Sequence, residues 1–397
     1  MDQGARSRLA LTALQFRVMP KLRRRDVCRL LGALPLAGAA HAAPRSELFD
    51  GATLKNWSVQ QGPESAYYVN DGNIVGSQSS GFPAWLRHDK VFENFDLQFE
   101  YFLKGWMDGG VYFSAPEHGF RKSWCGFKIS LFHQQDTEMR PNSPGAIFPF
   151  RAPKLVNVKN KGEWNQMRIR LDWPSLQVWS NGAVTHDVNL DSDPEFRHRL
   201  RSGYIGFETL SYPMRFRNVT IEELPARQQW ESLYEKPEEL TEKWTLTDLD
   251  ARFPARYEAL GRILRGDDLG NLTTKDKYRD FEIQMYIRGA AQHNGGLLFR
   301  SKGHRDWYEI QLHDVEEAHY PTGSLYFFKR STYPRVEPEQ WYFLQLIVKD
   351  ATALVRINGE DVMSYDRLEK LDPGFIELQA HARGKWIEYK HIRIRRI

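Results

Sequence analysis

An internal repeat constrains the fold of this chain more than any other feature of its sequence. Segment 91–99, VFENFDLQF, matches segment 277–285, KYRDFEIQM, which begins 186 residues later. The same features follow both segments in the same order: a Gly-Gly pair, a Trp that opens a strand, and an Asn-Gly turn. They are Gly109-Gly110, Trp164 and Asn181-Gly182 in the first copy, and Gly295-Gly296, Trp341 and Asn358-Gly359 in the second. The chain therefore contains two copies of one folding unit.

Short alternating segments and turn signals make up each copy, with helical periodicity only around 226–240. We expect one copy over 46–225, a connector over 226–239 and a second copy over 240–397. Many strands without strand–helix alternation predict an antiparallel sandwich or jelly roll per copy, with a small barrel as the alternative. The closing strands, 217–221 and 390–394, should pair beside the first strand of their own copy.

The first 42 residues have the pattern of a signal peptide. A basic cluster precedes the apolar run 30–40, which is too short to span a bilayer and ends at the cleavage signature Ala40-His41-Ala42. Translation could also start at Met19. The pair Arg24-Arg25 resembles a twin-arginine signal, and the general secretory route is the alternative. We expect a mature chain from Ala43 that is periplasmic or secreted.

Removing the leader changes the charge of the chain. The leader holds eight of the 55 Lys and Arg residues and two of the 51 Asp and Glu residues, which leaves 47 and 49 and a net charge of −2. This balance gives no support for a nucleic-acid or anionic-membrane partner. One cysteine, Cys125, is left, so no disulfide can form within the mature chain.

The stretch 307–314, WYEIQLHD, alternates strictly between apolar and polar residues. This period predicts a strand with Tyr308, Ile310 and Leu312 in the core. Glu309 and Gln311 then share the other face with His313, spaced about 6.5–7 Å apart. Such a face can handle protons or bind sugar hydroxyls, and the alternative is an ordinary solvated face.

Seven segments of the chain, in this order, resemble the 3-keto-disaccharide hydrolase domain family. They are 48–57 (LFDGATLKNW), Asp280-Phe281-Glu282, Gly295-Gly296, Tyr308–Leu312, Gly323–Tyr326, Trp341 before Asn358-Gly359, and 375–381 (FIELQAH). The resemblance covers nearly the whole mature chain as two copies. It implies an all-β protein with two tandem concanavalin A-like jelly-roll β-sandwich domains. It also implies an exported enzyme that acts on glycosides with a ketone at C3.

The two copies differ at the positions that could carry chemistry. Aligned on the central strand, the first copy has Lys128 in place of Glu309 and Ser130 in place of Gln311. It also has Ser114 where the second copy has Arg300. We therefore expect the second copy to hold the active site.

A ketone at C3 acidifies the C2 proton, so cleavage can proceed by proton abstraction and β-elimination. This chemistry needs a base, for which Glu309 or His381 is the candidate. Arg300 or a divalent metal ion would stabilise the enolate. The remaining predicted substrate-binding residues could contact sugar hydroxyls or stack on the ring, and some could ligate a metal: Gln311, Asp314, Gln379, Trp307 and Tyr326.

Each of these assignments has a structural alternative. Arg300 could be a surface cation, His381 a core hydrogen-bonding group and Trp307 a residue at the edge of the core. A lectin-like protein or a scaffold would also suit this fold class, and a conventional glycosidase is less favoured because no carboxylate pair can be located. The sequence contains no motif for zinc proteolysis, nucleotide hydrolysis or serine esterase chemistry.

Overall fold

The computed structural model of the protein describes residues 44–397, except 78–83, 106–107, 120, 134–137, 211–212, 228, 249–253, 304–305, 316 and 333–335. The predicted leader and cleavage site lie outside the described residues, so export stays a prediction. Among the residues described, no helix is long and apolar enough to cross a membrane.

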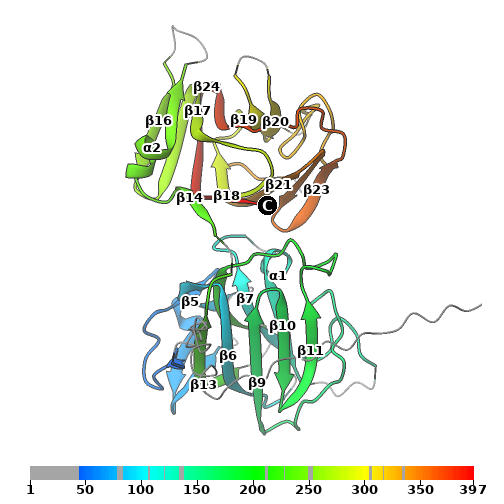
Figure 1. Ribbon diagram of the computed structural model, residues 1–397. Coiled ribbons are helices and arrows are strands. Elements are labelled where there is room, and N and C mark those ends of the chain that lie inside the picture. Colours follow the sequence, from blue (N-terminus) through cyan, green and yellow to red (C-terminus); the bar gives the residue numbers. More distant parts are fainter. Residues whose placement is uncertain are drawn as a thin grey trace, which may run out of the picture. The chain divides into compact units, whose positions relative to one another are not determined.

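The first copy of the repeat forms a sandwich of two antiparallel sheets, coloured blue to green in Figure 1. The larger sheet has the order β11-β10-β9-β6-β13-β4-β3, with β1 paired to β13. Its strands are β1 (Ser46–Glu47), β3 (Tyr67–Asn70), β4 (Asn73–Gly76), β6 (Asn94–Phe102), β9 (Trp164–Asp172), β10 (Ser175–Ser180), β11 (Ala183–Asn189) and β13 (Met214–Leu224). The smaller sheet is, in order, β2 (Trp57–Gln60), β5 (Trp85–Phe92), β12 (Gly203–Thr209), β7 (Asp108–Ala115) and β8 (Phe127–Phe132).

The second copy repeats this architecture with two long strands that belong to both sheets. Strand β24 (Gly374–Arg396) pairs with β19 through its first half and with β18 through its second half, and β17 (Ile263–Tyr278) follows it along both. One layer has the order β15-β17-β24-β19-β20, and the other β16-β17-β24-β18-β21-β22-β23, with β14 also on β24. The other strands are β14 (Glu231–Tyr234), β15 (Trp244–Thr247), β16 (Arg256–Leu260), β18 (Phe281–Gly289), β19 (Asn294–Ser301), β20 (Tyr308–His313), β21 (Tyr342–Lys349), β22 (Thr352–Ile357) and β23 (Glu360–Tyr365).

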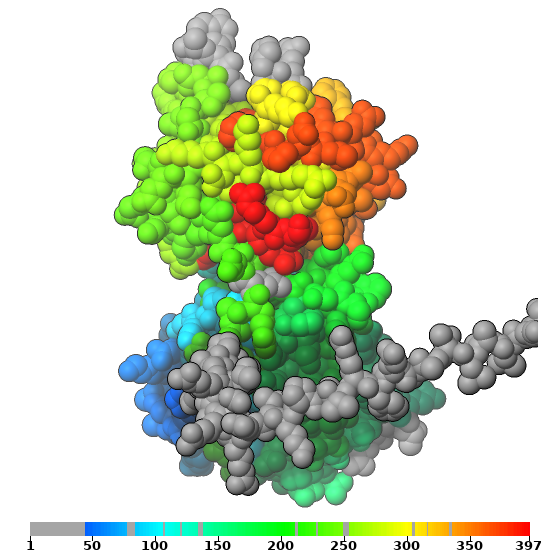
Figure 2. Space-filling view, in the orientation of Figure 1, coloured from blue at the N-terminus to red at the C-terminus, as the bar shows by residue number. Residues whose placement is uncertain are grey.

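Helices are few and short in the described chain: η2 (Glu64–Ala66), α1 (Lys122–Cys125) and α2 (Glu238–Lys243). The segment expected to be a connector contains β14 and the start of α2. The closing strand of the first copy, β13, pairs with β1 as predicted. The closing strand of the second copy, β24, pairs instead with β14, which lies in the segment expected to be the connector. Figure 2 shows the C-terminal residues, in red, at the surface of the second sandwich, where Ile397 is 40% exposed.

The predicted Asn-Gly hairpins are confirmed. Asn181 and Gly182 join β10 to β11 with φ values of 47° and 83°. Asn358 and Gly359 join β22 to β23 with φ values of 48° and 84°. Two consecutive residues with positive φ form the turn whose twist matches the flanking strands, which explains why this dipeptide stands here.

Alternation along the strands fills each core. Phe95 and Phe281, which the repeat places at the same position, are both fully buried. On β20, Tyr308, Ile310 and Leu312 belong to the core of the second sandwich, as their alternation predicts. The opposite side of β20 is therefore the outer face of its sheet.

Candidate functional site

The outer face of the layer β15-β17-β24-β19-β20 carries a group of polar side chains. Strand pairing sets Gln311 opposite Gly296 and Gly296 opposite Gln379, which in turn pairs with Asn271. One step along the strands, Glu309 faces Leu298, and Leu298 faces Glu377. We call the surface formed by Glu309, Gln311, Glu377, Gln379 and Asn271 the Glu309 face.

The Glu309 face is not the solvated polar face that was the structural alternative. Glu309 is 8% exposed, Gln311 5% and Gln379 8%. Burying a polar group destabilises the fold unless the group is hydrogen-bonded. A concentration of buried polar side chains on one face therefore marks it as a candidate functional site. Gln311 meets this need by donating from Nε2 to Asn294 Oδ1 at 2.6 Å.

The side chain of Glu309 lies directly over Gly296. A Cβ atom at this glycine would come within 2.4 Å of Glu309 Oε1, so only glycine leaves room for the carboxyl group. The Trp307 side chain donates a hydrogen bond to the carboxylate, but burial dominates and raises the pKa of Glu309 to about 7. A carboxyl group that titrates near neutrality can both take up and release a proton, as general acid–base catalysis requires.

Glu377 is a second carboxylate on this face, and the sequence analysis did not assign it a role. Its Oε2 accepts from Asn271 Nδ2 at 2.6 Å, and its Oε1 accepts from the Ser301 hydroxyl. Period-2 alternation with Gln379 would have placed it on the same face. These two hydrogen bonds hold the Glu377 carboxylate in place. The Glu309 carboxylate receives a side-chain hydrogen bond from Trp307.

Tyr326 lies beside Glu309 because its segment adds to the free edge of β20. The Tyr326 amide donates to Glu309 O at 2.9 Å, and Leu325 pairs with Ile310. Tyr326 belongs to a group of aromatic rings with Tyr320 and Phe327, at centroid distances of 5.3 Å and 4.1 Å. Phe327 is 75% exposed and has a φ of 67°. An exposed ring with two half-buried ones beside a polar face suits the apolar side of a sugar.

The structure does not bring Arg300 to Glu309. The Arg300 guanidinium is buried and donates to Arg279 O, Lys370 O and Asp280 Oδ1 at 3.0–3.1 Å. These contacts hold strand ends together, so the surface-cation alternative does not describe this side chain either. Its predicted role as enolate stabiliser gains no support from them.

His381 is exposed and lies beyond the Glu309 face on β24. It pairs with Leu269, four residues along the strand from Glu377. This separation corresponds to about 13 Å, so His381 does not share a level of the sheet with Glu309. Its predicted role as a base stays a prediction without geometric support.

Asp314 and His313 serve the turn between β18 and β19. Asp314 is buried, and its Oδ2 accepts from the Gln292 amide at 3.2 Å. The His313 ring contacts His293 O through Nδ1 at 2.6 Å. The structure thus brings together Trp307, Glu309, Gln311, Gln379 and Tyr326 of the predicted site residues.

The equivalent face of the first sandwich is closed by an ion pair. Lys128 lies over Gly110 as Glu309 lies over Gly296, and the strand register makes Glu208 the counterpart of Gln379. Lys128 Nζ is 2.5 Å from Glu208 Oε2, and the Tyr112 hydroxyl donates to Glu208 Oε1 at 2.9 Å. The predicted alignment of the two copies holds, and the first lacks a carboxyl group at the position of Glu309.

In the described part of the chain, no three or more His, Cys, Asp or Glu side chains are grouped so that they could hold a metal ion. The groups available on the Glu309 face are a carboxyl with a raised pKa, a fixed carboxylate, amides and aromatic rings. They allow proton transfer and the binding of hydroxyl groups.

The chain is an all-β protein of two tandem β-sandwiches, and the family match below identifies the carbohydrate-active class to which it belongs. The sequence profile of the 3-keto-alpha-glucoside-1,2-lyase-like domain matches residues 44–222 and 229–395. The chain therefore belongs to this family and contains two copies of its domain, as the resemblance implied. No curated protein matches the sequence.

Several solved structures are similar to parts of the chain. A Parabacteroides distasonis protein provisionally named a glycosyl hydrolase has 18% identity and a TM-score of 0.40, over 46% of this chain and 94% of its own. The carbohydrate binding module CBM66 from Bacillus subtilis has 13% identity and a TM-score of 0.31, over 42% and 96%. A galectin-like protein of unknown function from Bacillus subtilis has 13% identity and a TM-score of 0.35, over 46% and 96%. Each match spans about half of this chain.

Proposed function

We propose that the protein cleaves glycosides whose sugar carries a ketone at C3, with Glu309 as the general base. One observation carries this proposal: burial over Gly296 raises the pKa of Glu309 to about 7. Membership of the 3-keto-glucoside lyase-like family supports the substrate class. The leader pattern supports an exported enzyme, which N-terminal sequencing of periplasmic material would test through a start at Ala43.

In the proposed reaction, the Glu309 carboxylate takes the proton from C2 of the sugar. The electrons of the C2–H bond form an enolate with the C3 oxygen. The enolate then reforms the C3 ketone, a double bond forms between C1 and C2, and the C1–O bond breaks. The departing oxygen takes a proton from solvent. Addition of water across the new double bond completes a net hydrolysis.

Neighbouring side chains supply the other requirements of this reaction. The amide of Gln379 flanks Gly296 and could donate to the developing enolate oxygen. Gln311 is held by Asn294 and could contact a sugar hydroxyl. The rings of Tyr320, Tyr326 and Phe327 offer a stacking surface next to the base. Each group projects from a paired strand or its edge segment, which favours fixed geometry.

The first test compares a 3-keto-glucoside with the matching unoxidised glucoside, using the full chain. We expect cleavage of the ketone only, and a loss of about 10²–10⁴-fold in Glu309→Gln. Glu208→Gln is the matched control, because it makes the same change on the equivalent face of the first sandwich. It should retain activity within about threefold of the wild type. Equal cleavage of both sugars would indicate an ordinary glycosidase instead.

A second test follows the C2 proton itself. In deuterium oxide, abstraction at C2 exposes this carbon to solvent, so deuterium should appear at C2 of the cleaved sugar. NMR spectroscopy or mass spectrometry of the product would detect it. A hydrated product that keeps protium at C2 would rule out the elimination route.

The exposed aromatic group favours a second candidate, a glycan-binding protein without catalysis. Phe327 is exposed well beyond what packing requires, and a lectin would use such a ring without needing Glu309. Binding of sugars with no turnover of any ketone, unchanged in Glu309→Gln and lost in Phe327→Ala, would support this candidate over the enzyme.

A further inference from the structure

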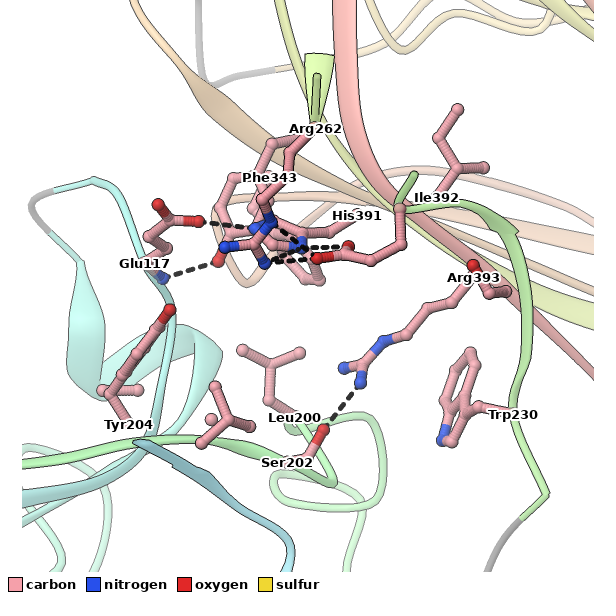
Figure 3. A pocket seen from close by; sticks show the side chains of 16 residues that line it. Glu117, Leu200, Ser202, Tyr204, Trp230, Arg262, Phe343, His391, Ile392 and Arg393 are labelled. Carbon is pink, nitrogen blue, oxygen red and sulfur yellow. Dashed lines mark hydrogen bonds and ion pairs between the residues drawn. The ribbon is translucent and has the colours of Figure 1, made fainter. Parts of the chain in front are cut away.

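A cavity of about 350 Å³ is lined by residues of both sandwiches and by no residue of the Glu309 face (Figure 3). This volume is near the lower end of small-molecule sites, which range over about 300–1,000 Å³. Charged and aromatic side chains line it, among them Glu117, Tyr204, Trp230, Glu235, Arg262 and Arg393. The mixture of charges and rings calls for a polar ligand of monosaccharide size.

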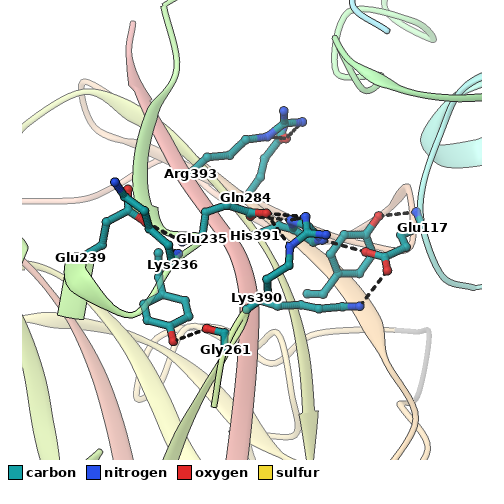
Figure 4. A network of polar contacts seen from close by, with 12 residues as sticks. Glu117, Glu235, Lys236, Glu239, Gly261, Gln284, Lys390, His391 and Arg393 are labelled. Atoms are coloured by element: carbon teal, nitrogen blue, oxygen red, sulfur yellow. Dashed lines mark hydrogen bonds and ion pairs between the residues drawn. The ribbon is translucent and has the colours of Figure 1, made fainter. Parts of the chain in front are cut away.

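A closed ionic network forms one wall of the cavity (Figure 4). The His391 ring lies between two carboxylates, with Nδ1 2.6 Å from Glu235 Oε2 and Nε2 2.7 Å from Glu117 Oε2. Burial opposes a charge on the ring, but these bonds outweigh it and raise the pKa of His391. Lys390 binds Glu117 at 3.0 Å, and Arg262 Nε binds Glu235 at 2.7 Å. The two carboxylates therefore have cationic partners already.

Arg393 lies apart from this network and has only neutral hydrogen-bond partners. Its guanidinium donates to Gln284 Oε1 at 2.7 and 3.0 Å and to Ser202 Oγ at 2.6 Å. Within the described residues, no carboxylate lies within ion-pair distance of it. With His391 protonated, the lining carries three cations, Arg262, His391 and Arg393, against two carboxylates. One positive charge is thus left for a ligand.

Aromatic rings lie next to this free cation. The Arg393 guanidinium is 4.7 Å from the centroid of the Trp230 ring. In Figure 3 this guanidinium points towards Ser202, and Tyr204 lies on the opposite side of Ser202 from Arg393. Trp230 Nε1 and Ser232 Oγ are buried and have no hydrogen-bond partner among the described residues. Unpartnered polar atoms and rings around a cation are the groups that a sugar acid would engage.

We propose that this cavity is a second carbohydrate site, which binds a sugar carrying a carboxylate. Arg393 pairs with the carboxylate, and Trp230 contacts the ring. The site would let the protein hold an acidic sugar independently of cleavage at the Glu309 face. This inference does not depend on the proposed reaction.

Isothermal titration of the full chain with D-glucuronate, D-glucose and acetate tests the proposal. Glucose lacks the carboxylate, and acetate lacks the ring. Glucuronate should bind at least about tenfold more tightly than either, because a charge-assisted hydrogen bond and ring contacts act together. Arg393→Gln should remove this advantage. Arg396→Gln makes the same charge change on an exposed residue of the same strand and should keep it.

Further variants keep the test decisive. Trp230→Leu should also weaken glucuronate binding. It replaces Arg393→Gln in the test if a thermal unfolding experiment shows that Arg393→Gln is not folded. Glu309→Gln should bind glucuronate as the wild type does. Equal affinity for glucuronate and either control ligand would overturn the proposal. So would unchanged binding in Arg393→Gln, or lost binding in Glu309→Gln.

Discussion

At the scale of single residues, the surroundings of Glu309 set its chemistry. In the described part of the chain, no cation is bonded to its carboxylate, whereas Lys128 neutralises Glu208 on the equivalent face of the first sandwich. Burial therefore outweighs the hydrogen bond from the Trp307 side chain and raises the pKa of Glu309 to about 7. A cationic neighbour would have lowered the pKa of Glu309 and removed the basis for proton transfer at neutral pH.

The raised pKa of Glu309 predicts the pH dependence of activity. Only the ionised carboxylate can take a proton, so kcat/KM for a 3-keto-glucoside should rise about tenfold per pH unit below about pH 7 and level off above it. Initial rates at low substrate concentration between pH 5 and pH 9 would measure this. A profile that is flat from pH 5 to pH 8 would contradict Glu309 as the base.

The same pKa predicts that Glu309 destabilises the fold at high pH. The folded state keeps the proton up to about pH 7 and the unfolded chain only to about 4.5, so the free energy of unfolding falls as pH rises between these values. Glu309→Gln removes this loss. Between pH 4 and pH 8, the free energy of unfolding of Glu309→Gln should increase by about 3 kcal/mol relative to that of the wild type. Urea denaturation at both values would measure it; no relative gain would mean that the carboxyl titrates normally.

At the scale of strands, register decides which side chains meet. The alternation along β20 predicts that Glu309 and Gln311 share a face, because side chains two residues apart always do. It cannot predict that Gly296 of β19 lies under Glu309, or that the segment of Tyr326 adds to the edge of β20. These neighbours come from pairing between segments distant in sequence.

Gly296 should therefore control the activity through space alone. In Gly296→Ala, the new Cβ would lie 2.4–2.9 Å from Glu309 side-chain atoms and displace the carboxyl group. We expect kcat/KM to fall at least about tenfold. Gly110→Ala is the matched control, because its Cβ would meet Lys128 in the same way. It should change stability and leave activity within about threefold; equal activity losses in both variants would refute the role of Gly296.

At the scale of the whole molecule, the two sandwiches share a small core in addition to the connector. Cys125 and Leu200 of the first sandwich pack with Tyr286 and Phe343 of the second. His198 O accepts from Gln345 Nε2 at 3.2 Å across the same boundary. A repeat in the sequence predicts two similar units but not the contacts between them. These contacts use different residues in each copy, so the repeated pattern does not record them.

Cys125 can report on this shared core. The thiol is buried, and burial raises its pKa to about 12, so reaction with a thiol reagent should be very slow in the folded protein. Phe343→Ala should raise the labelling rate at Cys125 at least about tenfold, as measured by mass spectrometry of the peptide. Val355→Ala truncates a residue of the second core only and is the control. Equal labelling rates in both variants would show that Phe343 does not shield Cys125.

The candidate site was predictable where it depends on local pattern and not where it depends on distance. Glu309, Gln311, Gln379, Trp307 and Tyr326 lie together, in agreement with motifs of alternating residues. His381 ends the motif 375–381, yet it lies about 13 Å along β24 from Glu377. Arg300 follows the Gly-Gly pair on β19, yet its guanidinium is held in strand-end contacts. A motif records order along the chain, while convergence depends on strand length and bulges.

The sequence by itself determined the repeat, the all-β class, the hairpin turns and the copy with a carboxyl group on its central strand. These are local properties, because side-chain period and turn residues act over a few positions. Only the tertiary structure decided that Glu309 is buried over Gly296 and that Lys128 forms an ion pair with Glu208. It also decided that Arg393 lines a cavity with no carboxylate of the described residues within ion-pair distance of its guanidinium. Burial and charge pairing are set by segments up to about 200 residues away, because desolvation depends on everything that surrounds a group in space.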